Sequence, residues 1–154
     1  MSTGNCKMKK WLYTLCLISI AALAASPPIM PNHQWTPGAV DPKSTVDKIC
    51  TPHYTEQVRD VPESVKKRVF ATYGIDPASD HYEIDHLISL ELGGSNDISN
   101  LWPQSYTTLP YNAHLKDHLE NTLHSMVCKG AVDLATAQKA ISTDWIAAYQ
   151  EYVK

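Results

Sequence analysis

The C-terminal part of the chain has the apolar spacing of two amphipathic helices. In residues 111–127 large apolar side chains recur at every fourth position, and Gly130 follows as a stop signal. In residues 134–152 apolar side chains recur three or four residues apart, and Asp133 precedes them as a candidate N-cap. The apolar positions are Leu115, Leu119, Leu123 and Val127 in the first helix and Leu134, Ala137, Ile141, Trp145, Ala148 and Tyr152 in the second.

The middle of the chain predicts a shorter helix followed by a hairpin. Residues 62–73 have helical spacing between a proline suited to a first turn and a glycine suited to ending a helix. Residues 82–92 are predicted to be extended, and residues 93–97 (GGSND) have turn chemistry. Residues 98–102 are predicted to form a short second strand, which Pro103 ends.

This order of helix, hairpin, helix and helix predicts an α+β fold with a small antiparallel ribbon. Residues 25–48 are rich in proline and have no apolar periodicity, so they are predicted to be an extended arm or linker. Residues 49–154 are predicted to form one domain, as expected for a chain of this length.

Residues 1–24 have the composition of a signal peptide. Three lysines precede an uncharged apolar run from Trp11 to Ala25, and Ala22-Leu23-Ala24 offers a small-residue cleavage site. The run has 15 residues, fewer than the roughly 20 that a membrane span needs. We therefore expect an exported bacterial protein, periplasmic or secreted, that meets the membrane only through this segment. An uncleaved anchor helix is the alternative.

Processing would make the protein more acidic. The full chain has 13 basic and 16 acidic residues and a formal net charge of −3. Loss of Lys7, Lys9 and Lys10 leaves 10 basic residues against 16 acidic ones, a net charge of −6. Such a chain lacks the broad basic surface of a tight DNA-binding protein, so we expect any nucleic-acid binding to be weak and salt-sensitive.

The same processing would remove two of the four cysteines. Cys50 and Cys128 remain, and two cysteines in an exported chain predict one disulfide. The bridge would close a loop of 78 residues and stabilise the fold by roughly 4 kcal/mol in the chain-entropy model. Two unrelated thiols are the alternative.

The predicted hairpin carries the side chains best suited to chemistry. Asp85 and His86 are neighbours in the first strand, so they point to opposite faces unless the strand bends there. The glycine turn would bring Asn100 near this pair, and the helix that begins near residue 112 could close the third side. Such a unit can hold one divalent cation, with Asp85 as an oxygen ligand and His86 as a general base on water. A structural pair without a metal is the alternative.

The segment from Glu83 to Glu120 resembles the HNH nuclease family, which has the ββα-metal fold. The residues that carry the resemblance are Glu83, Asp85, His86, Gly93, Gly94, Asn100 and Leu101, followed by a helix. The flanking sequences around Cys50 and Cys128 resemble a secreted bacterial and phage-associated branch of that family.

The resemblance implies phosphodiester hydrolysis, with His86 as general base, Asp85 as metal ligand and Asn100 as the residue that holds the catalytic loop. An oxygen-rich ligand set favours Mg²⁺ or Mn²⁺, while Zn²⁺ or Ni²⁺ are also compatible. Ser89 stands where the family usually has proline, which would loosen the turn. The zinc-binding cysteines of many family members are absent, and the predicted disulfide could supply the missing rigidity.

The metal ligand on the closing helix is not decided by the sequence. The family often has a histidine three residues before a lysine, and alignment on Lys116 puts Ala113 at that position. The candidates nearby are His114, which we favour, and then Asn112, His118 and Glu120.

The sequence thus predicts an exported, metal-dependent HNH-type endonuclease. It would act as a monomer on DNA, or on RNA as well, with low sequence specificity. Arg68 and Lys116 are the candidates for contact with phosphates. Two alternatives are an inactive ββα domain that binds a metal or a partner, and an exported structural or interaction protein.

Overall fold

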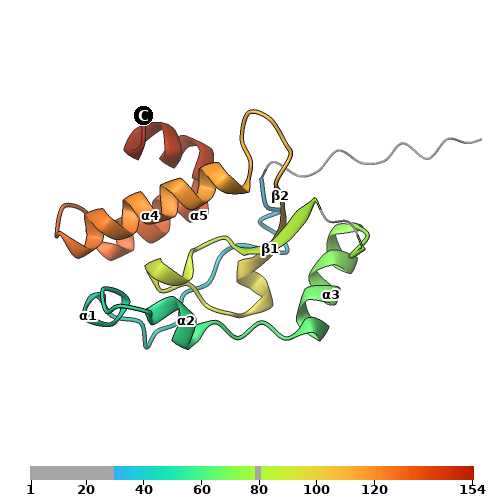
Figure 1. Ribbon diagram of the computed structural model, residues 1–154, viewed down its shortest axis with the longest axis horizontal. Coiled ribbons are helices and arrows are strands. Elements are labelled where there is room, and N and C mark those ends of the chain that lie inside the picture. Colours follow the sequence, from blue (N-terminus) through green and yellow to red (C-terminus); the bar gives the residue numbers. More distant parts are fainter. Residues whose placement is uncertain (1–29, 79–80) are drawn as a thin grey trace, which may run out of the picture.

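The computed structural model describes residues 30–78 and 81–154 and shows an α+β protein with a central two-stranded antiparallel ribbon (Figure 1). The predicted signal peptide and the first residues of the predicted arm lie outside the described residues. The elements are α1 Val46–Ile49, α2 Tyr54–Val58, α3 Glu63–Tyr73, β1 Tyr82–His86, β2 Leu101–Ser105, α4 Ala113–Cys128 and α5 Leu134–Tyr152. The predicted α+β class with a small antiparallel ribbon is therefore confirmed, and α3 lies on one side of the ribbon with the α4–α5 pair on the other.

The first strand is shorter than predicted. β1 ends at His86 instead of continuing to Leu92. The reason is Ser89, whose side-chain oxygen accepts a hydrogen bond from the backbone N–H of Glu91 at 3.2 Å and so begins a 3-10 turn. A hydroxyl that bonds to a nearby backbone group competes with strand pairing, and the chain leaves the ribbon directly after His86.

The two glycines that follow are required by two different constraints. Gly93 ends the 3-10 turn with a φ of 75°, in the left-handed region that favours glycine. At Gly94 an added Cβ atom would lie 1.7 Å from the carbonyl oxygen of Ile88. The glycine pair therefore allows the loop to fold back tightly on itself beside the end of β1.

The second strand begins later than predicted and passes through the proline. Ile98–Asn100 form a 3-10 turn that Asp97 caps, and β2 begins after it. Pro103 lies opposite Ile84 in the ribbon. Each strand of a two-stranded ribbon has an edge without a partner strand, where the missing N–H of proline is tolerated. The prediction that Pro103 ends the strand was therefore wrong.

The three longer helices confirm their predictions. α3 ends at Gly74, whose φ of 67° is again left-handed. α4 starts slightly later than predicted because the Asn112 side chain accepts a hydrogen bond from Leu115 N at 3.3 Å and caps the helix. α5 starts after Asp133, the predicted N-cap, which accepts a hydrogen bond from Thr136 N at 2.9 Å.

The hydrophobic core lies between α4, α5 and the loop that follows β1. The predicted apolar faces of both helices supply most of it, and the loop contributes Leu92. The predicted disulfide is confirmed: Cys50 and Cys128 join the residue after α1 to the end of α4, with their Cα atoms 5.7 Å apart. Within the described residues no helix is long and apolar enough to cross a membrane.

The described part of the predicted arm is bound to the ribbon loops and is not a free linker. Gly38 N donates to Ser99 O at 3.0 Å, and Ser95 N donates to Ala39 O at 2.9 Å. Thr36 is fully buried, and its hydroxyl donates to Leu101 O at 2.9 Å. These bonds satisfy the backbone of an irregular segment, as buried polar groups require, so residues 36–39 pack as part of the domain.

Candidate functional site

His86 lies at the end of β1 and is only 4% exposed. Its Nε2 lies 3.0 Å from Asn96 Oδ1, and the amide of Asn96 is oriented by a bond from Nδ2 to Val58 O at 2.7 Å. Because that bond makes Oδ1 the acceptor, the His86 proton must be on Nε2, which leaves Nδ1 free of a proton in the neutral ring. Burial lowers the pKa of His86 below its ordinary value of 6.5, so the neutral, basic form is favoured.

Asn100 is fully buried and holds the loop after β1. Its Oδ1 accepts from Ile88 N at 2.9 Å and from Ala39 N at 3.2 Å, while its Nδ2 donates to Ile88 O and Ser95 O, both at 2.9 Å. These contacts assign Asn100 a positioning role through the backbone and do not place it on a reacting atom. The residue that orients the His86 ring is Asn96, which the sequence reasoning missed within the turn segment GGSND.

Replacement of Asn100 with alanine should therefore lower the free energy of unfolding by about 2–3 kcal/mol, because four backbone groups lose their partner, two of them in buried bonds. Urea unfolding of both proteins measures the difference. Asn121 offers a matched control, since its exposed side chain makes a single bond to Asp117 O within its own helix. A change for Asn100→Ala no larger than for Asn121→Ala would contradict this role.

Asp85 is paired with a lysine from inside the protein. The Nζ atom of Lys116 lies 2.7 Å from Asp85 Oδ2 and donates to the carbonyl oxygen of His86 at 2.8 Å. The indole Nε1 of Trp102 donates to the same Oδ2 at 3.0 Å. Lys116 is fully buried, so it cannot reach a phosphate in solvent, and the prediction that it contacts substrate is wrong for this structure.

Glu120, one turn after Lys116 on α4, completes a buried charge cluster. Its Oε1 accepts a hydrogen bond from Lys116 Nζ. Burial alone would lower the pKa of Lys116, but the carboxylates of Asp85 and Glu120 outweigh it and hold that pKa well above its ordinary range. Burial raises the pKa of Glu120 to about 8. One ammonium cannot neutralise two buried carboxylates, so the cluster favours a retained proton on Glu120.

This proton predicts that stability falls as the pH rises. Folded Glu120 keeps its proton up to about pH 8, whereas the unfolded side chain loses it near the ordinary value of 4.5. In that window the folded state binds more protons, so the free energy of unfolding decreases with increasing pH. Below the window both states are protonated, and the contribution is fully present.

Urea unfolding at several pH values across this window, with EDTA present, measures the effect. Glu120→Gln should show a clearly smaller decrease than wild type, because glutamine stays neutral and still accepts a bond from Lys116. Glu151→Gln on the exposed surface of α5 is the control and should keep the wild-type slope. Equal slopes for Glu120→Gln and wild type would show that Glu120 is ionised in the folded protein.

A polar cavity of about 250 Å³ lies beside β1 and α4 and contains His86 in its wall. Burial raises the pKa of Glu83, Glu91 and Asp117, and nearby carboxylates raise it further. Such crowding of acids favours the uptake of positive charge, as protons or as a cation. Five carboxyl groups line the cavity: Glu83, Asp85, Glu91, Asp117 and Glu120.

Only one of the two carboxylate oxygens of Glu83 has a hydrogen-bond partner among the described residues. Tyr106 donates its hydroxyl proton to Glu83 Oε2 at 2.9 Å, and burial raises the pKa of Tyr106 to about 12, which keeps it a donor. Glu83 Oε1 is buried and has no hydrogen-bond partner among the described residues. A buried acceptor without a partner is costly, and a bound cation would satisfy it.

The structure separates the ligand candidates on the closing helix. Asn112 caps α4, and the exposed His118 packs edge-on against Tyr149 of α5, with ring centroids 6.3 Å apart. The exposed His114 packs on Tyr106, with centroids 5.5 Å apart, and does not line the cavity. The α4 residues that do line the cavity are Asp117, Glu120 and Asn121, and the sequence reasoning did not consider Asp117 or Asn121 as a ligand.

A second hollow adjoins the cavity and carries basic residues. It has a volume of about 390 Å³ and shares Arg59 and Glu83 with the cavity, while Lys66 of α3 lines it as well. Arg68 is exposed on α3 but lines neither hollow. Arg59, which the sequence reasoning missed because it lies far from the hairpin motif, therefore lines the same cavity as His86.

The donor set fits a hard divalent cation. Asp85 keeps Oδ1 beyond the bonds that Lys116 and Trp102 make to Oδ2, Glu83 offers the unpartnered Oε1, and Asp117 adds a carboxylate. Carboxylate oxygens are the ligands that Mg²⁺ and Mn²⁺ prefer. Lys116 is the only buried ammonium among the described residues of this cluster. The carboxyl groups around the cavity therefore outnumber it.

Comparisons of the chain with protein-family models, with curated proteins and with solved structures found no match. The candidate site is therefore defined by its own geometry: a neutral histidine of fixed tautomer, a group of crowded carboxylates and an adjoining basic hollow.

Proposed function

We propose that this protein is a metal-dependent endonuclease of the HNH type, which hydrolyses phosphodiester bonds of DNA or RNA with low sequence specificity. The observation that supports it most is the placement of neutral His86, with its proton held on Nε2 by Asn96, in one cavity with five carboxyl groups. A fixed base beside a cation site is the arrangement that metal-assisted hydrolysis requires.

In this proposal His86 is the general base. The bond to Asn96 leaves Nδ1 to take a proton from water, and the ring becomes cationic while Nε2 keeps its bond. The bonds from Asn96 to Val58 O and from Asn100 to the loop backbone keep the ring and the end of β1 in place. Asn96 and Asn100 are therefore positioning residues.

The cavity carboxylates would hold the metal. Asp85, Glu83 and Asp117 supply the oxygens described above, and Mg²⁺ or Mn²⁺ suits them best, although Zn²⁺ and Ni²⁺ belong in the test. When bound, a divalent cation supplies positive charge for the phosphate and the departing oxygen. Lys116 fixes Asp85 through Oδ2 and so orients the carboxylate.

Substrate phosphates would meet the basic hollow. Arg59 and Lys66 line it next to the cavity and can bind phosphate oxygens without reading the base sequence. Because the full chain has a net charge of −3, binding is expected to be weak, and because it rests on these ionic contacts it should weaken further with salt. The signal-like N-terminus supports export to the periplasm or the medium, where the disulfide is stable.

Plasmid nicking tests the proposal. The purified, oxidised protein should convert supercoiled DNA to nicked circles with Mg²⁺ or Mn²⁺ and should stop when EDTA is added. Arg59→Gln should lower the rate at low DNA concentration, whereas Arg68→Gln, outside both hollows, should change it much less. Absence of metal-dependent nicking with any of the four metals would reject the nuclease.

A second function is favoured by one specific observation. Lys116 already forms an ion pair with Asp85, the carboxylate that the nuclease proposal assigns to the metal. The second candidate function is therefore an inactive domain that binds a cation or a partner without hydrolysis. Isothermal titration with Mn²⁺ separates the two: binding that Asp85→Asn removes, in a protein without nicking activity, would identify a binding module.

A further inference from the structure

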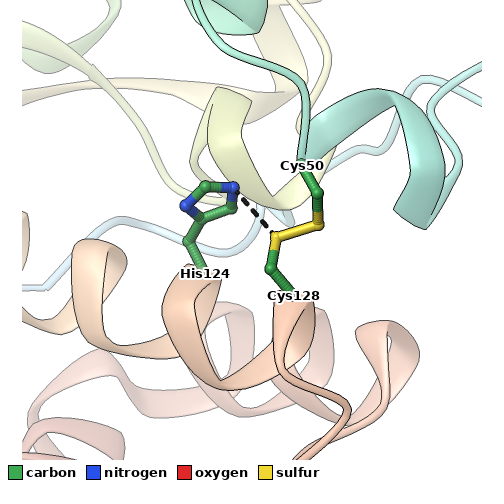
Figure 2. Close-up of side chains that lie close together, drawn as sticks. All are labelled: Cys50, His124 and Cys128. Carbon is green, nitrogen blue, oxygen red and sulfur yellow. Dashed lines mark hydrogen bonds between the residues drawn. A yellow bond between two sulfur atoms is a disulfide. The ribbon is translucent and has the colours of Figure 1, made fainter.

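Cys50, His124 and Cys128 form a compact cluster where the end of α1 meets α4 (Figure 2). His124 and Cys128 lie one turn apart on α4, and Cys50 faces them from the other segment. His124 Nε2 lies 3.3 Å from Cys128 Sγ, and one possible ligand atom from each residue lies within 4.8 Å of the others. The sulfurs are joined as a disulfide, which lacks the thiolates that bind metals.

We propose that reduction of the Cys50–Cys128 disulfide converts this cluster into a zinc site formed by two thiolates and the imidazole of His124. Two cysteines and one histidine with an open fourth position are a known kind of donor set for Zn²⁺. The bridge and the zinc site are alternatives, and the redox state of the two sulfurs selects between them. Its three ligands lie outside the lining of the His86 cavity, and the proposal does not depend on the proposed nuclease function.

The spacing of the three residues suits a tetrahedral ion. With Zn–S near 2.3 Å and Zn–N near 2.0 Å, a sulfur and a nitrogen ligand lie about 3.5 Å apart and two sulfurs about 3.8 Å apart. His124 Nε2 and Cys128 Sγ are already 3.3 Å apart. The Cα atoms of the two cysteines are 5.7 Å apart, so side-chain rotation can separate the sulfurs without a large movement of the backbone.

Glu91 provides the partner that a metal-bound histidine needs. Its Oε2 lies 3.4 Å from His124 Nδ1, on the opposite side of the ring from Cys128. A histidine that binds a metal through one nitrogen commonly donates its other N–H to a carboxylate, which fixes the tautomer. In the disulfide form His124 Nε2 lies 3.0 Å from Ile49 O, an acceptor, and therefore carries a proton that metal binding must displace.

The conversion balances with a dithiol as the reductant. The dithiol gives two electrons and two protons to the S–S bond, which yields two cysteine thiols and the cyclic disulfide of the reductant. Zn²⁺ binding then releases both thiol protons to solvent, and the imidazole proton moves from Nε2 to Nδ1. Cys128 is exposed and Cys50 half-buried, so a reductant can reach the bridge.

Cobalt binding tests this site directly. The protein is reduced with a dithiol, separated from it without oxygen and titrated with Co²⁺. The reduced wild type should bind one Co²⁺ with a thiolate-to-cobalt charge-transfer band, and Zn²⁺ should abolish the band by displacement. The oxidised protein should show no such band, and Cys128→Ser should lose it. Because carboxylates give no thiolate band, metal bound in the His86 cavity cannot produce this result.

Two further variants distinguish the proposed site from a simple pair of cysteines. Glu91→Gln should weaken Co²⁺ binding about 10–100-fold, and His124→Ala should weaken it at least as much. Thermal unfolding of the reduced wild type should shift upward with Zn²⁺ by more than that of reduced Cys128→Ser, because only the wild type has both thiolates. A reduced wild type without the band, or an affinity that His124→Ala leaves unchanged, would overturn the proposal.

Discussion

Replacing His86 with alanine is expected to lower the rate of metal-dependent plasmid nicking by about 10²–10⁴-fold, the usual contribution of a general base. His86 is the neutral ring whose Nδ1 is left without a proton by the bond from Nε2 to Asn96. The measurement is the initial rate of loss of supercoiled DNA at saturating Mn²⁺. Asn96→Ala should also lower the rate, but less, because the ring loses its orientation and not the base itself.

Two controls keep this result specific. His114→Ala changes an exposed histidine that does not line the cavity and should reduce the rate far less than His86→Ala. Thermal unfolding of each variant shows whether the buried ring is needed for folding, and the rate is compared only between folded proteins. Equal rates for folded His86→Ala and wild type would remove His86 from the chemistry. If the activity of His114→Ala no longer depended on metal, His114 would be the metal ligand that α4 supplies.

Replacing Lys116 with methionine is expected to lower the free energy of unfolding by about 3–5 kcal/mol near neutral pH. Methionine fills a similar volume but leaves the buried Asp85 and Glu120 without their shared cation, and the His86 carbonyl without its donor. The loss of one partner from a buried charge cluster costs more than the cluster contributes as a whole. Urea unfolding gives the difference directly.

The cluster also predicts which second substitution should recover part of the stability that Lys116→Met loses. Adding Asp85→Asn to Lys116→Met removes the carboxylate that lost its cation and should recover part of the lost stability, which double-mutant analysis measures. Lys139→Met, on the exposed surface of α5, is the matched control and should change stability by no more than about 0.5 kcal/mol. If Lys116→Met behaved like Lys139→Met, the buried charge cluster would not carry the stability assigned to it.

Local pattern was a reliable guide wherever a single face of one element decided the structure. The apolar spacing in residues 134–152 and the cap at Asp133 correspond to α5, and Pro62 and Gly74 bound α3 as expected. The strand ends were predicted less well. β1 stops at His86 because Ser89 bonds to the backbone of Glu91, a choice between two local hydrogen-bond patterns that apolar spacing does not distinguish.

The candidate site shows the same division. Asp85 and His86 of the hairpin do line one cavity, but the contacts that set their proposed roles come from distant parts of the chain. Arg59 reaches the cavity from the segment after α2, and Asn96, not Asn100, binds the His86 ring. Lys116 was expected to face phosphate and is instead buried against Asp85. An i, i+4 spacing shows that Lys116 and Glu120 are neighbours on α4, but not whether that face meets solvent or β1.

The sequence by itself determined the α+β class, the three longer helices, the Cys50–Cys128 pair and the segment that carries the candidate chemistry. Each of these follows from periodicity, from capping residues or from residue identity, which act over a few positions of the chain. Only the tertiary structure decided the tautomer of His86, the burial of Lys116 and the set of carboxylates that share one cavity. The physical reason is that protonation, burial and charge compensation depend on the groups that packing brings together, and these lie on elements far apart in the sequence.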